Sequence, residues 1–321
     1  MDFQALGKKL DREEPLTKED ALELLAVDAR SETFYTLLAL ANELSRREYA
    51  GRGYVFAQVG LNAEPCTGGC RFCSLAEGHF CVDGTYRLTE EEAVAAGLSA
   101  CIPGVSDLFL MTTADYPQEA FVRIGAAVRK KMPEGMRLVA NIGDFTPERA
   151  RELKAAGFTG VYHIRRLREG EDTCLPPRQR LDTLDAAKAA GLELYYCVEP
   201  IGPEHTHEEL ADEMLRARDY GVDRMAVMRR TPVPGTPLEK AGTISRLELT
   251  KIAAVARLVT RPRWSMNVHE PTEMALLAGV NQLYAEYGAN PRDVLGDTAS
   301  GRGFSIEKVR DMLENAGYTV G

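Results

Sequence analysis

The chain has little of what marks a membrane protein, a secreted protein or a nucleic-acid-binding protein. Its 321 residues contain no apolar run of about 18 residues, so the sequence predicts no membrane-spanning helix. The first residues lack the apolar core of a signal peptide, and we expect no secretion signal. The formal net charge is −9, whereas nucleic acids and anionic membranes bind a basic face.

Histidine is scarce as well, and the five histidines show no metal-binding spacing. Cysteine is more abundant, with seven residues. Cysteines without a secretion signal predict a reducing, cytoplasmic setting. We therefore expect a cytoplasmic protein that acts on a small molecule, with no nucleic-acid or membrane partner.

Three of the cysteines carry the clearest chemical signal. Cys66, Cys70 and Cys73 have the spacing C-x3-C-x2-C, and Gly68 and Gly69 between them allow the backbone to bend. Three thiolates so close in sequence can hold three irons of a [4Fe–4S] cube and leave the fourth iron open to a ligand. A zinc site or a disulfide pair is the alternative. Zinc usually takes four protein ligands from paired C-x2-C units or histidines, and neither pattern is complete here.

The cysteine loop, with Phe72 before its third cysteine, resembles the radical S-adenosylmethionine (SAM) superfamily. Further segments resemble the branch that contains biotin synthase, methylornithine synthase and the hydrogenase maturase. The resemblance covers roughly residues 20–290. The segments that carry it are residues 180–192, 234–238, 253–258 and 274–283.

The resemblance implies two cofactors, a [4Fe–4S] cluster and SAM. It implies an enzyme that reductively cleaves SAM to a 5′-deoxyadenosyl radical, which then abstracts hydrogen from a small-molecule or carrier-bound substrate. An electron donor such as ferredoxin or flavodoxin is implied too. The surplus cysteines favour sulfur insertion in cofactor biosynthesis, as in biotin and lipoyl synthases. The alternatives are a carbon-skeleton rearrangement or a cofactor maturation of the methylornithine synthase or hydrogenase maturase type, and a non-catalytic iron–sulfur protein.

Short runs rich in Val, Ile, Leu, Tyr and Phe alternate with amphipathic helices from Tyr54 onward. Eight such repeats predict an α/β fold, a (β/α)8 barrel of the TIM type over residues 51–321. Helices over 18–30 and 31–48 predict an N-terminal helical extension over residues 1–50. The predicted strands are Val55–Leu61, Asp107–Thr113, Arg137–Ile142, Gly160–Arg165, Leu192–Pro200, Arg224–Arg229, Trp264–Val268 and Gln282–Glu286.

Residues at the carboxyl ends of these strands are the candidate cofactor contacts, because a barrel of this type carries its active site there. Arg165 is matched in charge to the carboxylate of SAM and Glu169 to its ammonium group, with a solvated charged loop as the alternative. Thr112 and Thr113 offer oxygen atoms to the same ammonium group, unless they are ordinary strand residues. The full set that the resemblance implies is Phe72, Thr112, Thr113, Asn141, Arg165, Glu169 and Ile201, with Arg165 also as a catalytic residue.

Three further cysteines, Cys81, Cys174 and Cys197, are expected to face the mouth of the barrel. They predict either a second iron–sulfur cluster or sulfur donor, with Cys197 as a catalytic residue, or three free thiols in a reducing cytosol. The resemblance also implies that the ordinary [2Fe–2S] cluster of biotin synthase is absent. Its ligand positions hold Leu110, Val139, Tyr195 and Trp264.

Overall fold

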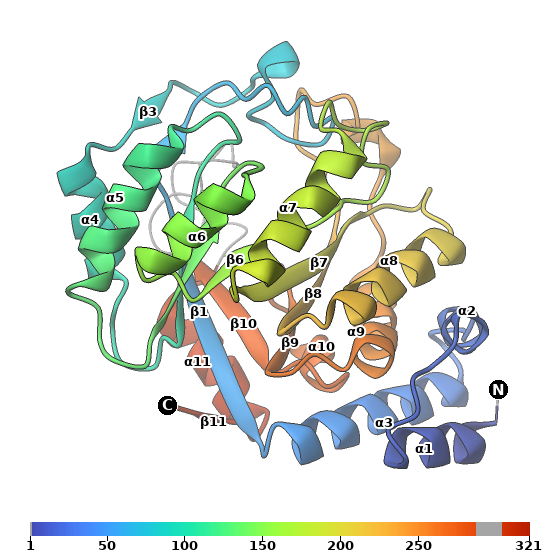
Figure 1. Cartoon of the computed structure of the whole chain (residues 1–321). Helices are drawn as coiled ribbons and strands as arrows, with labels where there is room; N and C mark the ends of the chain where they lie inside the picture. Colours follow the sequence, from blue (N-terminus) through green and yellow to red (C-terminus); the bar gives the residue numbers. More distant parts are fainter. Residues whose placement is uncertain (1, 287–303) are drawn as a thin grey trace.

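Eight parallel strands form a closed barrel at the centre of the molecule (Figure 1). The computed structural model describes residues 2–286 and 304–321. Each strand pairs with the next and β10 pairs again with β1, which confirms the predicted (β/α)8 barrel of the TIM type. The strands are β1 (Arg52–Gly60), β4 (Asp107–Met111), β5 (Arg137–Asn141), β6 (Gly160–Tyr162), β7 (Glu193–Ile201), β8 (Arg224–Arg229), β9 (Ser265–Val268) and β10 (Gln282–Glu286).

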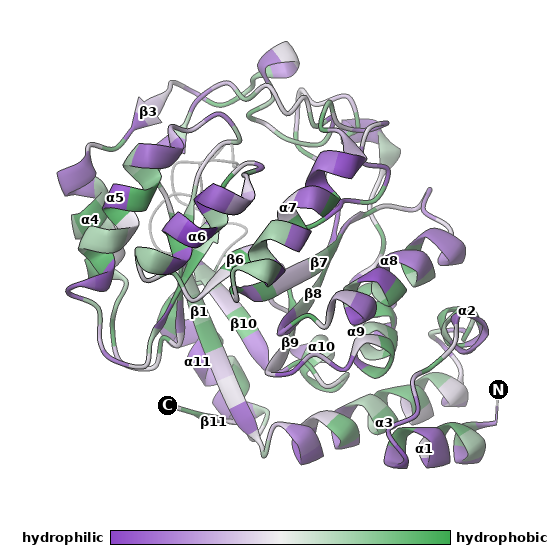
Figure 2. Cartoon of the chain, in the orientation of Figure 1, coloured by the Kyte–Doolittle hydropathy of each residue, from purple (hydrophilic) through white to green (hydrophobic). Residues whose placement is uncertain are grey.

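Helices alternate with the strands and cover the outside of the barrel (Figure 1). Thr89 and Thr206 begin two of them with capping boxes, in which each threonine and a glutamate three residues later cap one another's backbone. Hydrophobic residues are concentrated on the strands and on the helix faces that turn toward them (Figure 2). The helices are α4 (Glu90–Ser99), α5 (Gln118–Arg129), α6 (Pro147–Ala155), α7 (Pro177–Ala189), α8 (His207–Tyr220), α9 (Arg246–Thr260), α10 (Glu273–Leu276) and α11 (Ile306–Asn315).

Three helices precede the first strand: α1 (Phe3–Asp11), α2 (Lys18–Leu25) and α3 (Glu32–Glu48). The sequence predicts α2 and α3 but not α1, which Asp2 caps by accepting hydrogen bonds from two backbone N–H groups. Helix α3 packs on α9, where the buried Arg257 donates to Ser45 Oγ and forms an ion pair with Glu48. Helix α9 is buried along most of its length because it lies between the barrel and α3.

Short elements complete the two ends of the barrel. Strands β2 (Asn62–Ala63) and β3 (Tyr86–Arg87) pair in an antiparallel way beyond the end of β1. Strand β11 (Thr319–Val320) pairs with the first residues of β1, so the C-terminal segment returns to the amino-terminal end of the barrel. Two short 3-10 helices, η1 (Glu77–His79) and η2 (Glu239–Ala241), lie in loops. In the described part of the chain we find no helical segment with the length and hydropathy needed to pass through a bilayer.

A buried polar network fills the amino-terminal end of the barrel. One Asp107 carboxylate oxygen accepts hydrogen bonds from the Tyr195 hydroxyl (2.6 Å) and from Arg224 Nε (3.1 Å). Its other oxygen accepts from Gln282 Nε2 at 3.1 Å. The Asp107 and Arg224 side chains are 0% and 2% exposed, so each charge depends on the other for compensation. The network connects strands on opposite sides of the barrel. Because it fills the amino-terminal end, a cavity for ligands can lie only toward the carboxyl end of the strands.

Replacement of Asp107 by alanine is expected to lower the free energy of unfolding by about 3–5 kcal/mol, because it leaves the buried Arg224 charge without a partner. Denaturant titration monitored by circular dichroism measures this loss. The control is Arg151→Ala, which breaks an exposed pair with Glu148 and is expected to leave the unfolding midpoint unchanged. An equal effect of the two substitutions would contradict a stabilising role for the network.

Candidate functional site

The loop after β2 carries the three cysteines of the C-x3-C-x2-C motif. Cys66, Cys70 and Cys73 all line one cavity at the carboxyl end of the barrel. The loop folds back on itself, since Cys66 N–H donates to the Leu75 carbonyl (2.7 Å) and Cys73 N–H donates to the Cys70 carbonyl (3.0 Å). A Cβ atom built on Gly68 would lie 3.4 Å from Cys66 Sγ and 3.8 Å from Cys70 Sγ. The two sulfurs therefore converge over the glycine.

Gly69 is required for this loop conformation for two reasons. Its φ is +58°, in the left-handed region that residues with a side chain rarely adopt. A Cβ atom at this position would also lie 2.4 Å from the Sγ atom of Cys174. Any side chain here would displace the loop that holds Cys66, Cys70 and Cys73.

Three other loops at the same end of the barrel hold the cysteine loop in place. After β4, Asp115 accepts hydrogen bonds from Thr67 N–H (2.7 Å) and Thr67 Oγ1 (2.5 Å). After β6, Asp172 pairs with Arg71 at 2.9 Å. After β8, Leu238 N–H donates to the Arg71 carbonyl at 3.1 Å. The positions of the thiols are therefore largely organised before any metal binds.

The thiol environment and the donor set fit an iron–sulfur cluster. Burial raises the pKa of Cys66, and burial raises the pKa of Cys70 to about 12, although the charge of Arg166 opposes the second shift. Both thiols are therefore protonated at neutral pH until a metal displaces their protons. All seven cysteines lie within the described residues, and those of the motif are the three that line the cavity. Three sulfur donors fit a [4Fe–4S] cube with one open iron.

Four of the predicted cofactor contacts line the same cavity as the cysteines. Thr112 and Thr113 follow β4, Asn141 ends β5, and Phe72 lies in the cysteine loop. Asn62 holds Thr113 in place: its carbonyl oxygen accepts from Thr113 N–H (3.0 Å), and its amide donates to Thr113 Oγ1 (2.8 Å). The structure thus brings together residues that are up to about 75 positions apart in the sequence, as the barrel predicts.

Arg165 does not line the cavity, whereas its neighbour Arg166 does. The Arg165 backbone N–H donates to the Tyr196 hydroxyl (3.4 Å), and Tyr196 faces outward to Glu213 of α8. Strand β6 ends at Tyr162, three residues before the predicted end at Arg165, and in the loop that follows it is Arg166 that reaches the cavity. A shift of one residue moves a side chain from the inside of the barrel to the outside, and the sequence alone does not determine which of two neighbouring residues points inward.

Glu169 and Ile201 are buried beside the cavity and are absent from its lining. Glu169 accepts hydrogen bonds from Arg166 N–H (2.8 Å) and from the Thr173 hydroxyl (2.7 Å). Its carboxylate also lies 3.6 Å from Arg180 Nε. Glu169 therefore supports two cavity cations from behind, which differs from the predicted contact with an ammonium group of SAM.

Arg180 of α7 lines the cavity, although sequence reasoning did not select it as a contact. It is 4% exposed and donates to the Ile164 carbonyl (3.1 Å) and to Asp144 Oδ1 (2.9 Å). Arg166 also reaches the site with a side chain that is 15% exposed, and its Nε lies 3.4 Å from a carboxylate oxygen of Glu199. Two guanidinium groups therefore reach the cavity from the β6 loop and from α7.

The structure does not bring Cys81, Cys174 and Cys197 together. Cys174 is exposed and contacts Gly69 from outside the cysteine loop. Cys81 N–H donates to the Ser74 carbonyl (3.0 Å), and its Sγ lies 3.8 Å from a Cβ atom built on Gly235. Cys197 is buried inside the barrel. Because these three surroundings differ, the placement does not favour the predicted second cluster over free thiols.

The deeper part of the cavity is lined by residues outside the predicted set of cofactor contacts. Glu199 is one, and it accepts a hydrogen bond from the Tyr162 hydroxyl at 2.8 Å. Strand alternation from Cys197 predicts that Glu199 faces inward, so this residue was within reach of sequence reasoning. The others come from the ends of β8 and β9, where parity is hard to assign. They are Met228, Arg230, His269 and Glu270.

A buried histidine–aspartate pair supports the wall of the cavity. His163 Nε2 lies 3.0 Å from Asp144 Oδ1, and both side chains are nearly or fully buried. Burial and the charge of Arg180 lower the pKa of His163 from its ordinary value of 6.5 to about 3. Burial alone would raise the pKa of Asp144, but interactions with His163 and Arg180 outweigh it and lower that pKa to about 2. His163 is therefore neutral at physiological pH.

Comparison with known proteins finds relatives along the whole chain, although no family model matches it. Biotin synthase of Desulforudis audaxviator is 27% identical over 318 residues, which cover 94% of this chain and 92% of the relative. Biotin synthase of Saccharopolyspora erythraea is 26% identical over 328 residues, covering 99% and 90%.

Solved structures share the fold of this chain. The crystal structure of methylornithine synthase (PylB) has a TM-score of 0.85 at 19% identity, covering 98% of this chain and 97% of that one. The hydrogenase maturase HydG from Carboxydothermus hydrogenoformans has a TM-score of 0.81 at 20% identity, covering 98% and 78%.

The barrel, the three-cysteine loop at its mouth and these relatives define the class: this protein is a radical SAM enzyme. Its cofactors are accordingly a [4Fe–4S] cluster and SAM. Within the superfamily, the chain is similar in sequence to biotin synthases, and it shares the fold of methylornithine synthase and the hydrogenase maturase HydG. The predictions of family and cofactors are confirmed at this level.

The His163→Asn substitution is expected to make the protein less sensitive to acid. The unfolded chain binds a proton at His163 below about pH 6.5 and the folded chain only near pH 3, so the native protein loses stability across that interval. The loss is at most about 1.4 kcal/mol per pH unit, and the variant lacks it. Asp144 has an ordinary pKa of 3.8 and a pKa of about 2 in the folded protein, so its protonation affects stability only at a lower pH than the two values compared here.

Denaturant titrations at neutral pH and near pH 5 measure the change in the free energy of unfolding. The difference between the two pH values should be smaller in the variant by roughly 1–2 kcal/mol. Equal pH dependence of the two proteins would show that His163 is not held neutral by its surroundings.

Proposed function

We propose that this enzyme removes a hydrogen atom from a small-molecule or carrier-bound substrate in the barrel cavity, with Cys66, Cys70 and Cys73 as the cluster ligands. The bound cluster supplies the electron that cleaves SAM to methionine and a 5′-deoxyadenosyl radical. The observation that carries the proposal is that these three thiols line a cavity that runs into the barrel. An electron donor such as ferredoxin or flavodoxin, in a reducing cytoplasm, is consistent with seven free cysteines.

We assign the binding of SAM to the residues around the cysteine loop. Thr112, Thr113 and Asn141 present oxygen atoms at the ends of two adjacent strands, which suits an ammonium group. Arg166 and Arg180 present guanidinium groups, which suit a carboxylate. Phe72 is placed to contact an aromatic ring. Glu169 acts as a positioning residue for Arg166, and Ile201 packs behind the wall.

The deeper residues support a polar substrate with charged groups. Glu199, Met228, Arg230, His269 and Glu270 line this part of the cavity, so acidic and basic side chains lie close together. Such mixed charge suits a zwitterionic molecule of the amino-acid type. Burial by the barrel would exclude water from a radical reaction, which prevents side reactions.

Among the possible outcomes, the geometry supports a carbon-skeleton rearrangement or cofactor maturation of the methylornithine synthase or hydrogenase maturase type best. Sulfur insertion from a second cluster needs several cysteines in one place, and Cys81, Cys174 and Cys197 have separate surroundings. The biotin synthase positions Leu110, Val139, Tyr195 and Trp264 offer no sulfur ligand. Sulfur insertion is the second candidate, and the biotin synthases among the relatives favour it.

Alanine at Cys66, Cys70 or Cys73 is expected to abolish formation of 5′-deoxyadenosine from SAM and dithionite, because two thiolates do not hold the cube with an open iron. Iron content, from about four per chain in the native protein, should fall in parallel. Chromatography of the products and iron analysis measure both effects. The control is Cys101→Ser, between α4 and β4 and outside the cavity lining, which should retain both. Undiminished product from any one of the three alanine variants would contradict the assignment.

The iron and sulfide content of the anaerobically reconstituted enzyme distinguishes the two outcomes. About four irons and four sulfides per chain are expected for a carbon-skeleton rearrangement, because the SAM-cleaving cluster suffices, and this count would weaken sulfur insertion. About eight irons, with sulfide consumed during turnover, would instead support sulfur insertion. If about eight irons are found, the Cys197→Ala variant tests where the second cluster lies. A fall to about four irons in this variant would place that cluster in the barrel interior, where Cys197 is buried.

A further inference from the structure

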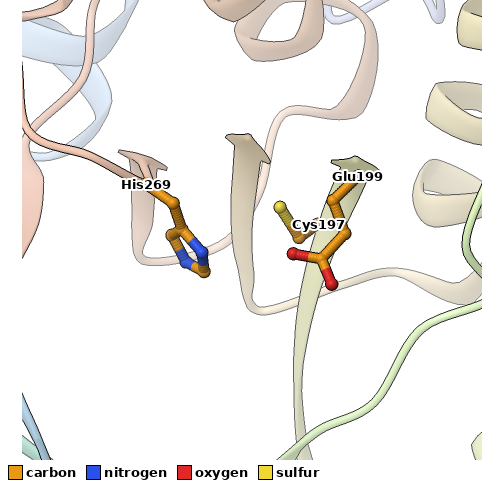
Figure 3. A group of neighbouring side chains, drawn as sticks. All are labelled: Cys197, Glu199 and His269. Atoms are coloured by element: carbon orange, nitrogen blue, oxygen red, sulfur yellow. The ribbon is translucent and has the colours of Figure 1, made fainter. Parts of the chain in front are cut away.

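Three side chains with metal-binding atoms meet near the carboxyl ends of β7 and β9 (Figure 3). Cys197 and Glu199 lie two residues apart on β7, so they face the same side of the strand. His269 follows β9, on the other side of β8, and its ring points toward them (Figure 3). One ligand atom from each, Sγ, a carboxylate oxygen and a ring nitrogen, lies within 4.8 Å of the other two.

Neighbouring side chains orient two of the three groups. The Tyr162 hydroxyl donates to one carboxylate oxygen of Glu199 (2.8 Å), and Arg166 Nε lies 3.4 Å from the other. The His269 ring stacks on Tyr162, with 5.8 Å between ring centroids, and meets the rings of Phe56 and Tyr284 edge-on. Metal-binding carboxylates and imidazoles are commonly oriented by such surrounding groups.

Asn267 supplies an independent observation that points to a ligand at this place. It lies on β9 two residues before His269, and in register Asn267 pairs with Ala226, which pairs with Cys197. The Asn267 carboxamide on β9 is therefore level with Cys197 on β7. On β8, which lies between these two strands, only the small side chain of Ala226 separates them. Asn267 is 3% exposed, and within residues 2–286 and 304–321 its Oδ1 atom accepts no hydrogen bond. A buried oxygen of this kind normally has a partner, which a metal-bound water would supply.

We propose that Cys197, Glu199 and His269 bind one divalent transition-metal ion, Zn²⁺ or Fe²⁺, inside the barrel. One sulfur, one nitrogen and one oxygen form a donor set that both ions accept. The Cys197 thiolate and the Glu199 carboxylate would balance the two positive charges of the ion. Arg166, which lies beside Glu199, would still have the carboxylate of Glu169 as a partner.

The ligand set also explains where the ion would act. Three protein ligands leave one position open in a tetrahedral site, as in catalytic zinc sites. Glu199 and His269 line the cavity, so that position would face the space we assign to the substrate. The site differs from the second iron–sulfur cluster considered above, because it uses one of the seven cysteines and two ligands of other kinds.

The test uses the full chain with its cluster reconstituted, loaded with Zn²⁺ and dialysed against a weak chelator. Elemental analysis is expected to find about one zinc per chain with iron unchanged at about four. X-ray absorption at the zinc edge should show a single sulfur at about 2.3 Å and nitrogen or oxygen ligands at about 2.0–2.2 Å. Zinc bound by the cluster cysteines would instead show several sulfurs and displace iron.

Three single substitutions, Cys197→Ser, His269→Gln and the isosteric Glu199→Gln, are each expected to weaken zinc binding by more than about tenfold. Cys101→Ser, outside the cavity lining, is the matched control and should retain the ion. Unchanged circular dichroism and unchanged cluster iron identify the variants that are folded. If Cys197→Ser does not fold, the comparison uses the isosteric Glu199→Gln variant. The proposal is overturned if the native enzyme retains no more zinc than these variants, or if the zinc has no sulfur ligand.

Discussion

Closure of the strand ring between β10 and β1 is the constraint on which the rest of the structure depends. Because all eight strands run parallel, every loop that follows a strand emerges at the same rim. The cysteine loop, the threonines after β4 and the arginine after β6 thus become neighbours. At the opposite end, the ion pair of Asp107 with Arg224 joins β4 to β8 across the interior. The polar network around it fills that end.

Other loops of the same rim hold the cysteine loop in place, although the loop has little regular secondary structure of its own. Two of its backbone groups, Thr67 N–H and the Arg71 carbonyl, are paired with Asp115 and Leu238 of other loops, and these contacts do not depend on a metal. Arg71 and Asp172 add a partly exposed ion pair. Gly69 fits tightly against Cys174, which ties the loop after β6 to the cysteine loop. A cofactor site built in this way loses little conformational entropy when the cofactor binds.

Buried charge inside the cavity is balanced in pairs, and this balance shapes the chemistry. Arg166 lies between Glu169 and Glu199, while Arg180 lies beside Asp144 and Glu169. Desolvation makes unpaired charges costly in such surroundings, so each cation is kept by its acidic neighbours. A ligand that brings its own carboxylate or metal ion must fit into these pairs. The sites proposed for SAM, substrate and metal therefore share residues and are expected to influence one another.

The sequence by itself determined the class of fold, the order of its strands and the three cysteines, since these depend on local patterns and short spacing. Predicted strands such as Arg224–Arg229 and Gln282–Glu286 agree with β8 and β10 residue for residue. Only the tertiary structure decided that Arg166 rather than Arg165 enters the cavity, and that Cys197 has Glu199 and His269 beside it. A shift of one residue is enough to turn a side chain from the inside of the barrel to the outside. Contacts across the barrel depend in addition on the registers of the strands, which no local sequence pattern encodes.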